Sequence, residues 1–219
     1  GLHVSGEAPE YFARRRVEWL KSCLQNLQAH PRKVLDFGCG VGLSIPHLFA
    51  ALGAEQVSGV DLSEQSLEVA RSRNSDSRVR FSRLDIHAVS EPNDLVFCNG
   101  VFHHIPPDER GSIVEYIYRS LKPGGFFSLW ENNPWNPGAR WVMRRIPFDR
   151  GAIVISAARA RDLLESAGFE IVRTDFQFIF PHFLRMFRGL ESLLSRWPLG
   201  AQYQVLARKP ENGKALSPQ

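Results

Sequence analysis

The chain has 219 residues, of which 43% are hydrophobic and 23% charged, and its formal net charge is +4. This length suits one α/β domain, and the apolar content supports a buried core, which excludes a wholly disordered chain. No run approaches the roughly 18 apolar residues of a membrane span. The arginine clusters lack the interleaved aromatic residues of a nucleic-acid groove. We therefore expect neither a membrane span nor a nucleic-acid partner.

The three cysteines, Cys23, Cys39 and Cys98, are odd in number and widely spaced. They form no CxxC motif, which argues against a disulfide framework and against a zinc site. This usage fits a reducing cytosol, so we expect a cytoplasmic protein without a metal. We expect residues 210–219 to form a disordered tail.

Short apolar strands alternate with helical patterns through the first 130 residues. After an N-terminal helix that reaches about Leu27, the pattern predicts strands at 33–37, 56–60, 79–84, 94–99 and 126–130, with helices at 41–52, 63–73 and 108–121. Ser63 is the expected N-cap of its helix. Such alternation predicts right-handed βαβ units and a parallel sheet covered on both faces. Ligands of these sheets bind beyond the carboxyl ends of the strands.

The second half of the chain has a different pattern. Residues 132–155 read as a long irregular segment, followed by a helix at 157–167, a strand at 170–178, a helical segment at 180–197 and a last strand at 202–208. Structureless segments of this length are uncommon in compact domains unless they are functional. We expect one domain over 1–209, in which 1–29 forms a covering helix and 132–156 and 179–200 form a substrate lid.

The glycine-rich sequence VLDFGCGVG, at residues 34–42, is the strongest chemical signal. It lies at an expected strand-to-helix turn, where glycine lets a ligand approach the backbone. Its spacing is GxGxG, whereas dinucleotide-binding turns have GxGxxG. Asp36 precedes the glycines Gly38 and Gly40, and its carboxylate suits the cationic amino group of an amino acid better than a pyrophosphate.

Two further acids, Asp61 and Asp85, end the second and third expected strands. An acid at the first of these places can accept both hydroxyls of a ribose. An acid followed by an apolar residue, here Ile86, can bind an adenine amino group and cover the face of the ring. Together with Asp36, these acids fit a ligand that contains an amino acid, a ribose and an adenine.

The chain resembles the class I S-adenosylmethionine (SAM) dependent methyltransferases. The resemblance is carried, in order, by VLDFGCGVG (34–42), VSGVDLS (57–63), RLDIHAV (83–89), NDLVFCNGVFHHI (93–105) and LKPGGFFSLWE (121–131). It covers residues 30–132 well and the remainder more loosely. It implies a Rossmann-like seven-stranded α/β sheet of order 3-2-1-4-5-7-6, with an antiparallel last strand and helices on both faces. It also implies SAM as cofactor, bound by residues that include Gly38, Gly40, Asp61, Leu62, Asp85, Ile86, Asn99 and Gly100.

The N-terminal helix offers further cofactor contacts. In similar enzymes such a helix closes over the cofactor, so Tyr11 is expected near the sulfonium and Arg15, or its neighbour Arg14, near the SAM carboxylate. An amphipathic covering helix with solvated arginines explains the same residues equally well.

Two adjacent histidines follow the fourth expected strand. Either suits a general base, with His104 slightly preferred to His103, and His103 is also an expected substrate contact. A structural role for both is the main alternative. Glu131, at the end of the fifth strand, is expected at the rim of the site as a base or as a group that binds a cationic substrate.

The substrate pocket is expected from Asn132, Trp135, Trp141 and the Phe-rich segment that follows the sixth strand. Residues 180–197 are expected to pack as core or lid, although their arginines and large apolar residues also fit a helix on a membrane surface. The predicted reaction is methylation of a small molecule, most readily on oxygen or nitrogen. A nicotinamide-dependent oxidoreductase and a non-catalytic SAM-binding protein are the alternatives. The chain could be a monomer or a homodimer.

Overall fold

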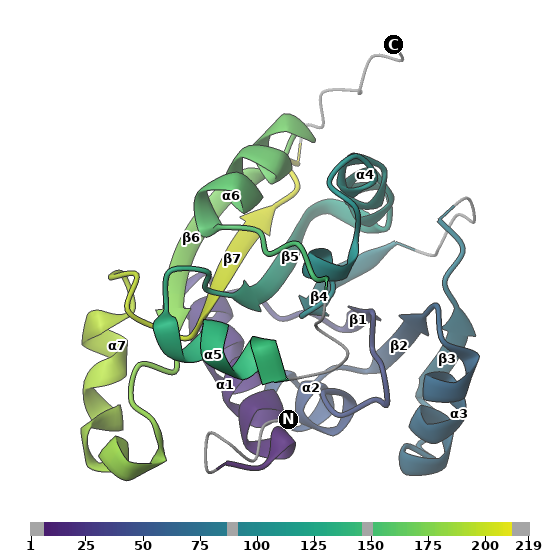
Figure 1. Cartoon of the computed structure of the whole chain (residues 1–219). Coiled ribbons are helices and arrows are strands. Elements are labelled where there is room, and N and C mark those ends of the chain that lie inside the picture. The colour runs from purple at the N-terminus through teal and green to yellow at the C-terminus, as the bar shows by residue number, and fades with distance from the viewer. Residues whose placement is uncertain (1–6, 87–91, 146–150, 212–219) are drawn as a thin grey trace.

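The computed structural model describes residues 7–86, 92–145 and 151–211, and its centre is one seven-stranded sheet (Figure 1). The strands are β1 (Lys33–Phe37), β2 (Gln56–Asp61), β3 (Val79–Arg83), β4 (Asn93–Asn99), β5 (Leu121–Asn132), β6 (Glu170–Gln177) and β7 (Gln202–Arg208). Their spatial order is β3-β2-β1-β4-β5-β7-β6. Strands β1 to β5 pair in parallel, and β7 runs antiparallel to both β5 and β6. The predicted order and the antiparallel last strand are confirmed.

Helices cover both faces of the sheet. They are α1 (Pro9–Asn26), α2 (Ile45–Leu52), α3 (Glu64–Arg73), α4 (Arg110–Arg119), α5 (Pro137–Arg145), α6 (Ala157–Ser166) and the short α7 (Glu191–Leu194), with 3-10 turns η2 (Phe102–His104) and η4 (His182–Leu190). One buried cluster joins α1 and α2 to the sheet through side chains such as Leu20 and Leu48. The other joins α4 and α6 to the opposite face through Ile117 and Leu164. The sheet is therefore the middle layer of three.

Predicted helix limits differ from the observed ones in two places. The second helix begins at Ile45 instead of residue 41, because Gly40 and Gly42 have φ of 52° and 74° and extend the turn. The helix expected at 108–121 ends at Arg119, and β5 already begins at Leu121. The N-cap of α3 is confirmed, since the Ser63 hydroxyl accepts the Ser66 N–H at 3.2 Å.

The segment expected to be irregular contains a helix, α5. Its signal was present in the sequence: the Asn136 side chain accepts the Ala139 N–H at 2.9 Å, and Pro137 occupies the first helical position. Asn at the N-cap followed by Pro is a strong helix start.

The segment 180–197 is also built differently from the helix that we expected to pack as core or lid. Most of it is the 3-10 turn η4, which is interrupted at Leu184, and several of its large apolar side chains face solvent. Core packing, one of the two placements that we expected for this segment, is therefore not seen for these side chains.

Most of the expected disordered tail, 212–219, lies outside the described residues, as do 87–91 and 146–150. Within the described ranges, no helix combines the length and apolar character that a bilayer crossing requires. The three cysteine thiols are buried and free.

Candidate active site

The glycine loop after β1 is bound to the end of β2. The N–H groups of Gly38 and Cys39 both donate to the Val60 carbonyl, at 2.8 and 3.0 Å. The Gly40 N–H donates to Asp61 Oδ2 at 2.8 Å, and the Ser63 N–H donates to Asp61 Oδ1 at 2.9 Å. Two backbone donors therefore fix the Asp61 carboxylate beside the loop, at the place where a ribose-binding acid is expected.

Two buried acceptors on neighbouring strands lack a partner among the described residues. They are Asp36 Oδ2 at the end of β1 and Asn99 Oδ1 at the end of β4. Burial, with a smaller effect of Asp61, raises the pKa of Asp36 to about 7. A buried polar atom without a hydrogen bond is costly, so such atoms commonly mark a binding site. An ammonium group, with three N–H donors, is the kind of partner that such acceptors require, and it would favour the ionised form of Asp36.

Position 38 requires glycine, both because of its backbone conformation and because there is no room for a side chain. Its φ is +68°, and a Cβ at this position would lie 2.3 Å from Val101 Cγ2. We expect Gly38→Ala to lower the free energy of unfolding by about 2–4 kcal/mol, because backbone strain and overpacking act together. Gly40→Ala is the matched control, since Gly40 also has positive φ but no atom within 4 Å of its Cβ position. Its expected loss is about 1 kcal/mol. Equal losses in urea denaturation without ligand would contradict this explanation.

A buried histidine–glutamate pair lies next to the end of β4. His103 Nδ1 is 2.7 Å from Glu131 Oε2, and Glu131 Oε1 accepts the Phe102 N–H at 2.7 Å. The sequence predicts Glu131 at the rim of the site, but the structure places it beneath His103 and almost wholly buried, because β5 pairs with strands on both sides. A proton on Nδ1 that is shared with this carboxylate leaves the lone pair on Nε2. The neighbouring His104 is exposed, and its ring centroid lies 4.0 Å from that of His103.

Both histidines line a cavity of about 490 Å³ that is mainly apolar. Its walls come from α1, the end of β4, α5 and the segment after β6; they include Tyr11, Phe12, Asn99, Gly100, Asn132, Asn136, Ala139, Trp141, Val142, Phe178 and Phe180. Parts of both expected lid segments thus line the same cavity as the histidines. The size and lining suit a small apolar molecule together with part of a cofactor.

Arg16 also lines this cavity, and sequence reasoning missed it. Its Nε donates to Gln202 Oε1 at 2.9 Å, and Gln202 Nε2 donates to Asn132 Oδ1 at 3.0 Å. Burial lowers the pKa of Arg16 to about 9, against the opposing effect of Glu131. The expected contact residue, Arg15, instead pairs with Glu18 at 3.3 Å. A buried guanidinium in a cavity wall is suited to binding a carboxylate.

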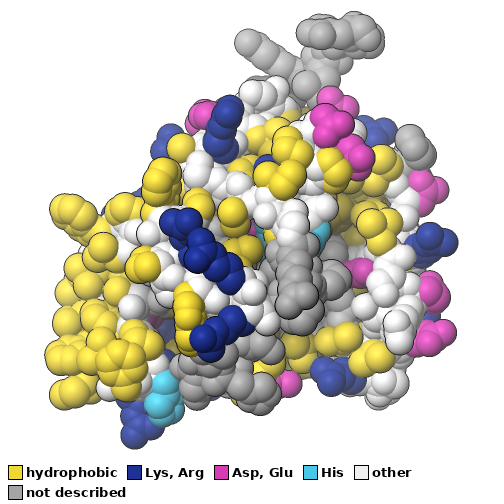
Figure 2. All heavy atoms as spheres, in the orientation of Figure 1, with side chains coloured by type: hydrophobic (Ala, Val, Ile, Leu, Met, Phe, Trp, Pro, Cys, Tyr) yellow, Lys and Arg dark blue, Asp and Glu magenta, His cyan; other side chains and the backbone are white. Residues whose placement is uncertain are grey.

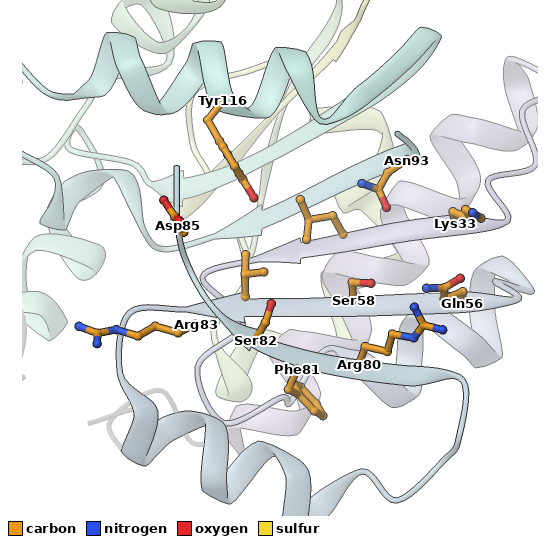
Figure 3. A pocket seen from close by; sticks show the side chains of 12 residues that line it. Lys33, Gln56, Ser58, Arg80, Phe81, Ser82, Arg83, Asp85, Asn93 and Tyr116 are labelled. Atoms are coloured by element: carbon orange, nitrogen blue, oxygen red, sulfur yellow. The ribbon is translucent and has the colours of Figure 1, made fainter. Parts of the chain in front are cut away.

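Other predicted site residues lie away from this cavity. Trp135 is 75% exposed and absent from the lining, because its backbone N–H is held by Asn133 Oδ1 in a turn. Leu62 is exposed beside the Asp61 end of β2. Ile86 packs against the core beneath the sheet end. Asp85 lines a second, polar cavity of about 690 Å³ over β1, β2 and β3, with Ser58 and Arg80 among its walls (Figure 3).

Known proteins are similar to this chain in both sequence and fold. Residues 34–125 match the family model described as "Methyltransferase domain". The chain is 33% identical over 145 residues to the ubiquinone biosynthesis O-methyltransferase of Bordetella avium, covering 60% of this chain and 58% of that protein. The enzyme of the same name from Leptothrix cholodnii is 33% identical over 146 residues, covering 60% of each chain.

Residues 34–125 are thus similar to a methyltransferase domain, and the sheet order is the one that the resemblance to class I SAM-dependent methyltransferases implies. The chain spans about three fifths of the length of the curated relatives that it matches.

Solved structures support the fold at lower identity. A putative sarcosine dimethylglycine methyltransferase from Galdieria sulphuraria has a TM-score of 0.65 and 17% identity, covering 90% of this chain and 86% of that one. Magnesium protoporphyrin IX methyltransferase from Synechocystis PCC 6803, solved with bound S-adenosylhomocysteine (SAH), has a TM-score of 0.63 and 20% identity, covering 90% and 83%. SAM is the cofactor of this class of domain.

Proposed function

We propose that this protein transfers a methyl group from SAM to a hydroxyl of a small acceptor with an apolar or aromatic body. The observation that carries this proposal is the His103–Glu131 pair in the wall of an apolar cavity, directly after the end of β4. An amine is the second acceptor to test, because a histidine base serves both. The name of the curated relatives, an O-methyltransferase, favours oxygen.

The proposed cofactor-binding residues are the two unpartnered acceptors and the acid at the end of β2. Asp36 and Asn99 would bind the ammonium of the methionine part, and Asp61 would bind the ribose. Arg16, in the cavity wall, would bind a carboxylate, either that of the cofactor or that of the acceptor. Asp85 and Ile86 remain the expected adenine contacts. When bound, SAM supplies a methyl group on a cationic sulfur.

Side chains of the protein carry out the proton transfer and position the acceptor. His103 Nε2 accepts the proton of the acceptor hydroxyl, and the buried Glu131 carboxylate keeps the imidazole oriented and stabilises its charged form. Trp141 and Phe180 of the lid segments, which line the same cavity, hold the apolar body of the acceptor and exclude water.

A turnover assay tests this proposal. The protein is incubated with SAM and a panel of catechols, phenols with alkyl side chains and aromatic amines, and SAH formation is measured. We expect SAH only with some of these acceptors, with hydroxyl compounds ahead of amines. Tight SAM binding without turnover of any acceptor would instead support a non-catalytic SAM-binding protein.

A further inference from the structure

Large apolar side chains stand exposed together on η4, α7 and the turn that follows. Phe183, Met186 and Leu193 are 79%, 81% and 76% exposed. We call this set the apolar surface: Phe183, Met186, Phe187, Leu190, Leu193, Trp197 and Leu199. Figure 2 shows hydrophobic side chains gathered along the edge of the molecule that carries α7 in Figure 1. Single exposed apolar residues are ordinary, but a contiguous set of this kind marks an interaction site.

This segment turns polar side chains toward the protein and apolar side chains toward solvent, whereas a helix packed on a core does the opposite. Glu191 is buried, where it accepts the N–H groups of Ile179 and Phe180 at 2.9 and 3.0 Å. Ser195 is buried as well, and its carbonyl accepts the Phe176 N–H at 2.6 Å. Polar groups thus fix the segment to the protein, which leaves its large apolar side chains facing outward.

Exposed arginine side chains lie on the segments that carry and flank the apolar surface. The segments 132–145 and 179–200 together contain six arginines and one acid, Glu191, in a chain whose net charge is only +4. That acid is buried, whereas Arg140, Arg144 and Arg185 are exposed. Figure 2 shows basic side chains on the same face, next to the apolar surface. Apolar side chains flanked by arginine are complementary to the interface of an anionic bilayer.

The apolar surface continues into the wall of the site cavity. Phe180 and Pro181, just before η4, and Trp141 of α5 line that cavity. The segment that carries the apolar surface and part of the cavity wall are therefore neighbours in the chain.

We propose that the apolar surface docks on an anionic lipid bilayer. Phe183, Met186 and Leu193 enter the interface, and the arginines of α5 together with Arg185 contact the lipid phosphates. A second copy of the chain is a poorer occupant, because a symmetric contact through this surface would bring two sets of arginines together. The proposal goes beyond the proposed function and does not depend on methyl transfer.

Vesicle co-sedimentation tests this docking without any substrate. Vesicles of phosphatidylcholine with 30% phosphatidylglycerol are compared with pure phosphatidylcholine. We expect the protein to bind the anionic vesicles and to bind more weakly at high salt. The triple variant Phe183→Ser, Met186→Ser, Leu193→Ser should lose at least tenfold in partitioning, because it removes the buried apolar area. The control Leu27→Ser, Val69→Ser changes exposed apolar residues on other elements and should bind as the parent does.

A second pair of variants tests whether vesicle binding depends on the arginines beside the apolar surface. Arg140→Gln, Arg144→Gln, Arg185→Gln should reduce binding to anionic vesicles roughly 100-fold. Arg73→Gln, Arg80→Gln, Arg161→Gln removes the same charge from exposed positions on α3, β3 and α6 and should have a much smaller effect. Equal losses in the two triple variants would overturn the proposal. So would an absence of vesicle binding together with a dimer that the apolar variant converts to a monomer in sedimentation velocity.

Discussion

Replacement of His103 by Ala is expected to lower kcat about 10²- to 10⁴-fold, while the Kd for SAH stays within about threefold of the parent value. The ring is the only part of the proposed machinery that accepts the acceptor's proton, so its loss affects the chemical step and leaves cofactor binding intact. His104→Ala is the control, because this exposed ring is not the partner of Glu131 in the 2.7 Å contact. Its expected loss is less than about tenfold. The assignment is overturned if His104→Ala loses turnover and His103→Ala does not.

Glu131→Gln tests the positioning role of the carboxylate. A glutamine can still accept the Phe102 N–H, but its NH₂ group would donate to His103 Nδ1 and move the proton to Nε2. We expect kcat to fall about 10²- to 10⁴-fold with little change in KM. The acidic limb of the kcat profile should also move to lower pH, because an imidazole without this anion holds its proton less strongly. A loss of kcat with an unmoved profile would indicate a merely structural role.

Replacement of Asp36 by Asn is expected to weaken SAM binding by about 2–4 kcal/mol, or roughly 30- to 1,000-fold in Kd. Asp36 and Asn99, on neighbouring strands, are buried acceptors without a hydrogen-bond partner among the described residues, and the variant removes the only charge that this pair carries. The parent protein should bind SAM more tightly as pH rises from 6 to 8, since the pKa of Asp36 is about 7 and the ionised form binds the ammonium. Isothermal titration across this pH range should show that rise in the parent and not in Asp36→Asn.

The same change should stabilise the protein without ligand. Because burial raises the pKa of Asp36 from 3.8 to about 7, its carboxyl costs the fold stability as pH rises from about 4 to about 7. At pH 8 we expect Asp36→Asn to raise the free energy of unfolding by about 1–3 kcal/mol, and at pH 4 to leave it nearly unchanged. Glu115→Gln, at an exposed position on α4, is the control and should change stability at neither pH. A loss of stability at pH 8 would contradict the account of Asp36.

The sheet and the cofactor side of the site could be predicted because their signals are local. Short apolar runs define β1, β2 and β4, and the acids Asp36 and Asp61 lie in or at the ends of those strands. The sequence order of the motifs then predicts their meeting at one edge of the sheet.

The acceptor side depends on contacts between distant residues, which local patterns do not reveal. Three consecutive arginines lie on α1, and only the rotation of the packed helix decides that Arg16 faces the cavity while Arg15 pairs with Glu18. The burial of Glu131 beneath His103 likewise depends on the pairing of β5 with β4. The exposure of the apolar residues of η4 also could not be predicted, because the sequence pattern does not show which side of this segment contacts the rest of the protein.

Titration of SAH into the unmodified protein at pH 8 decides whether the ends of β1, β2 and β4 form a SAM site. We expect a one-to-one complex with a micromolar or lower Kd that Asp36→Asn weakens at least 30-fold, and no binding of NADH. Binding of NADH in preference to SAH, or SAH binding that is indifferent to Asp36, would contradict the account.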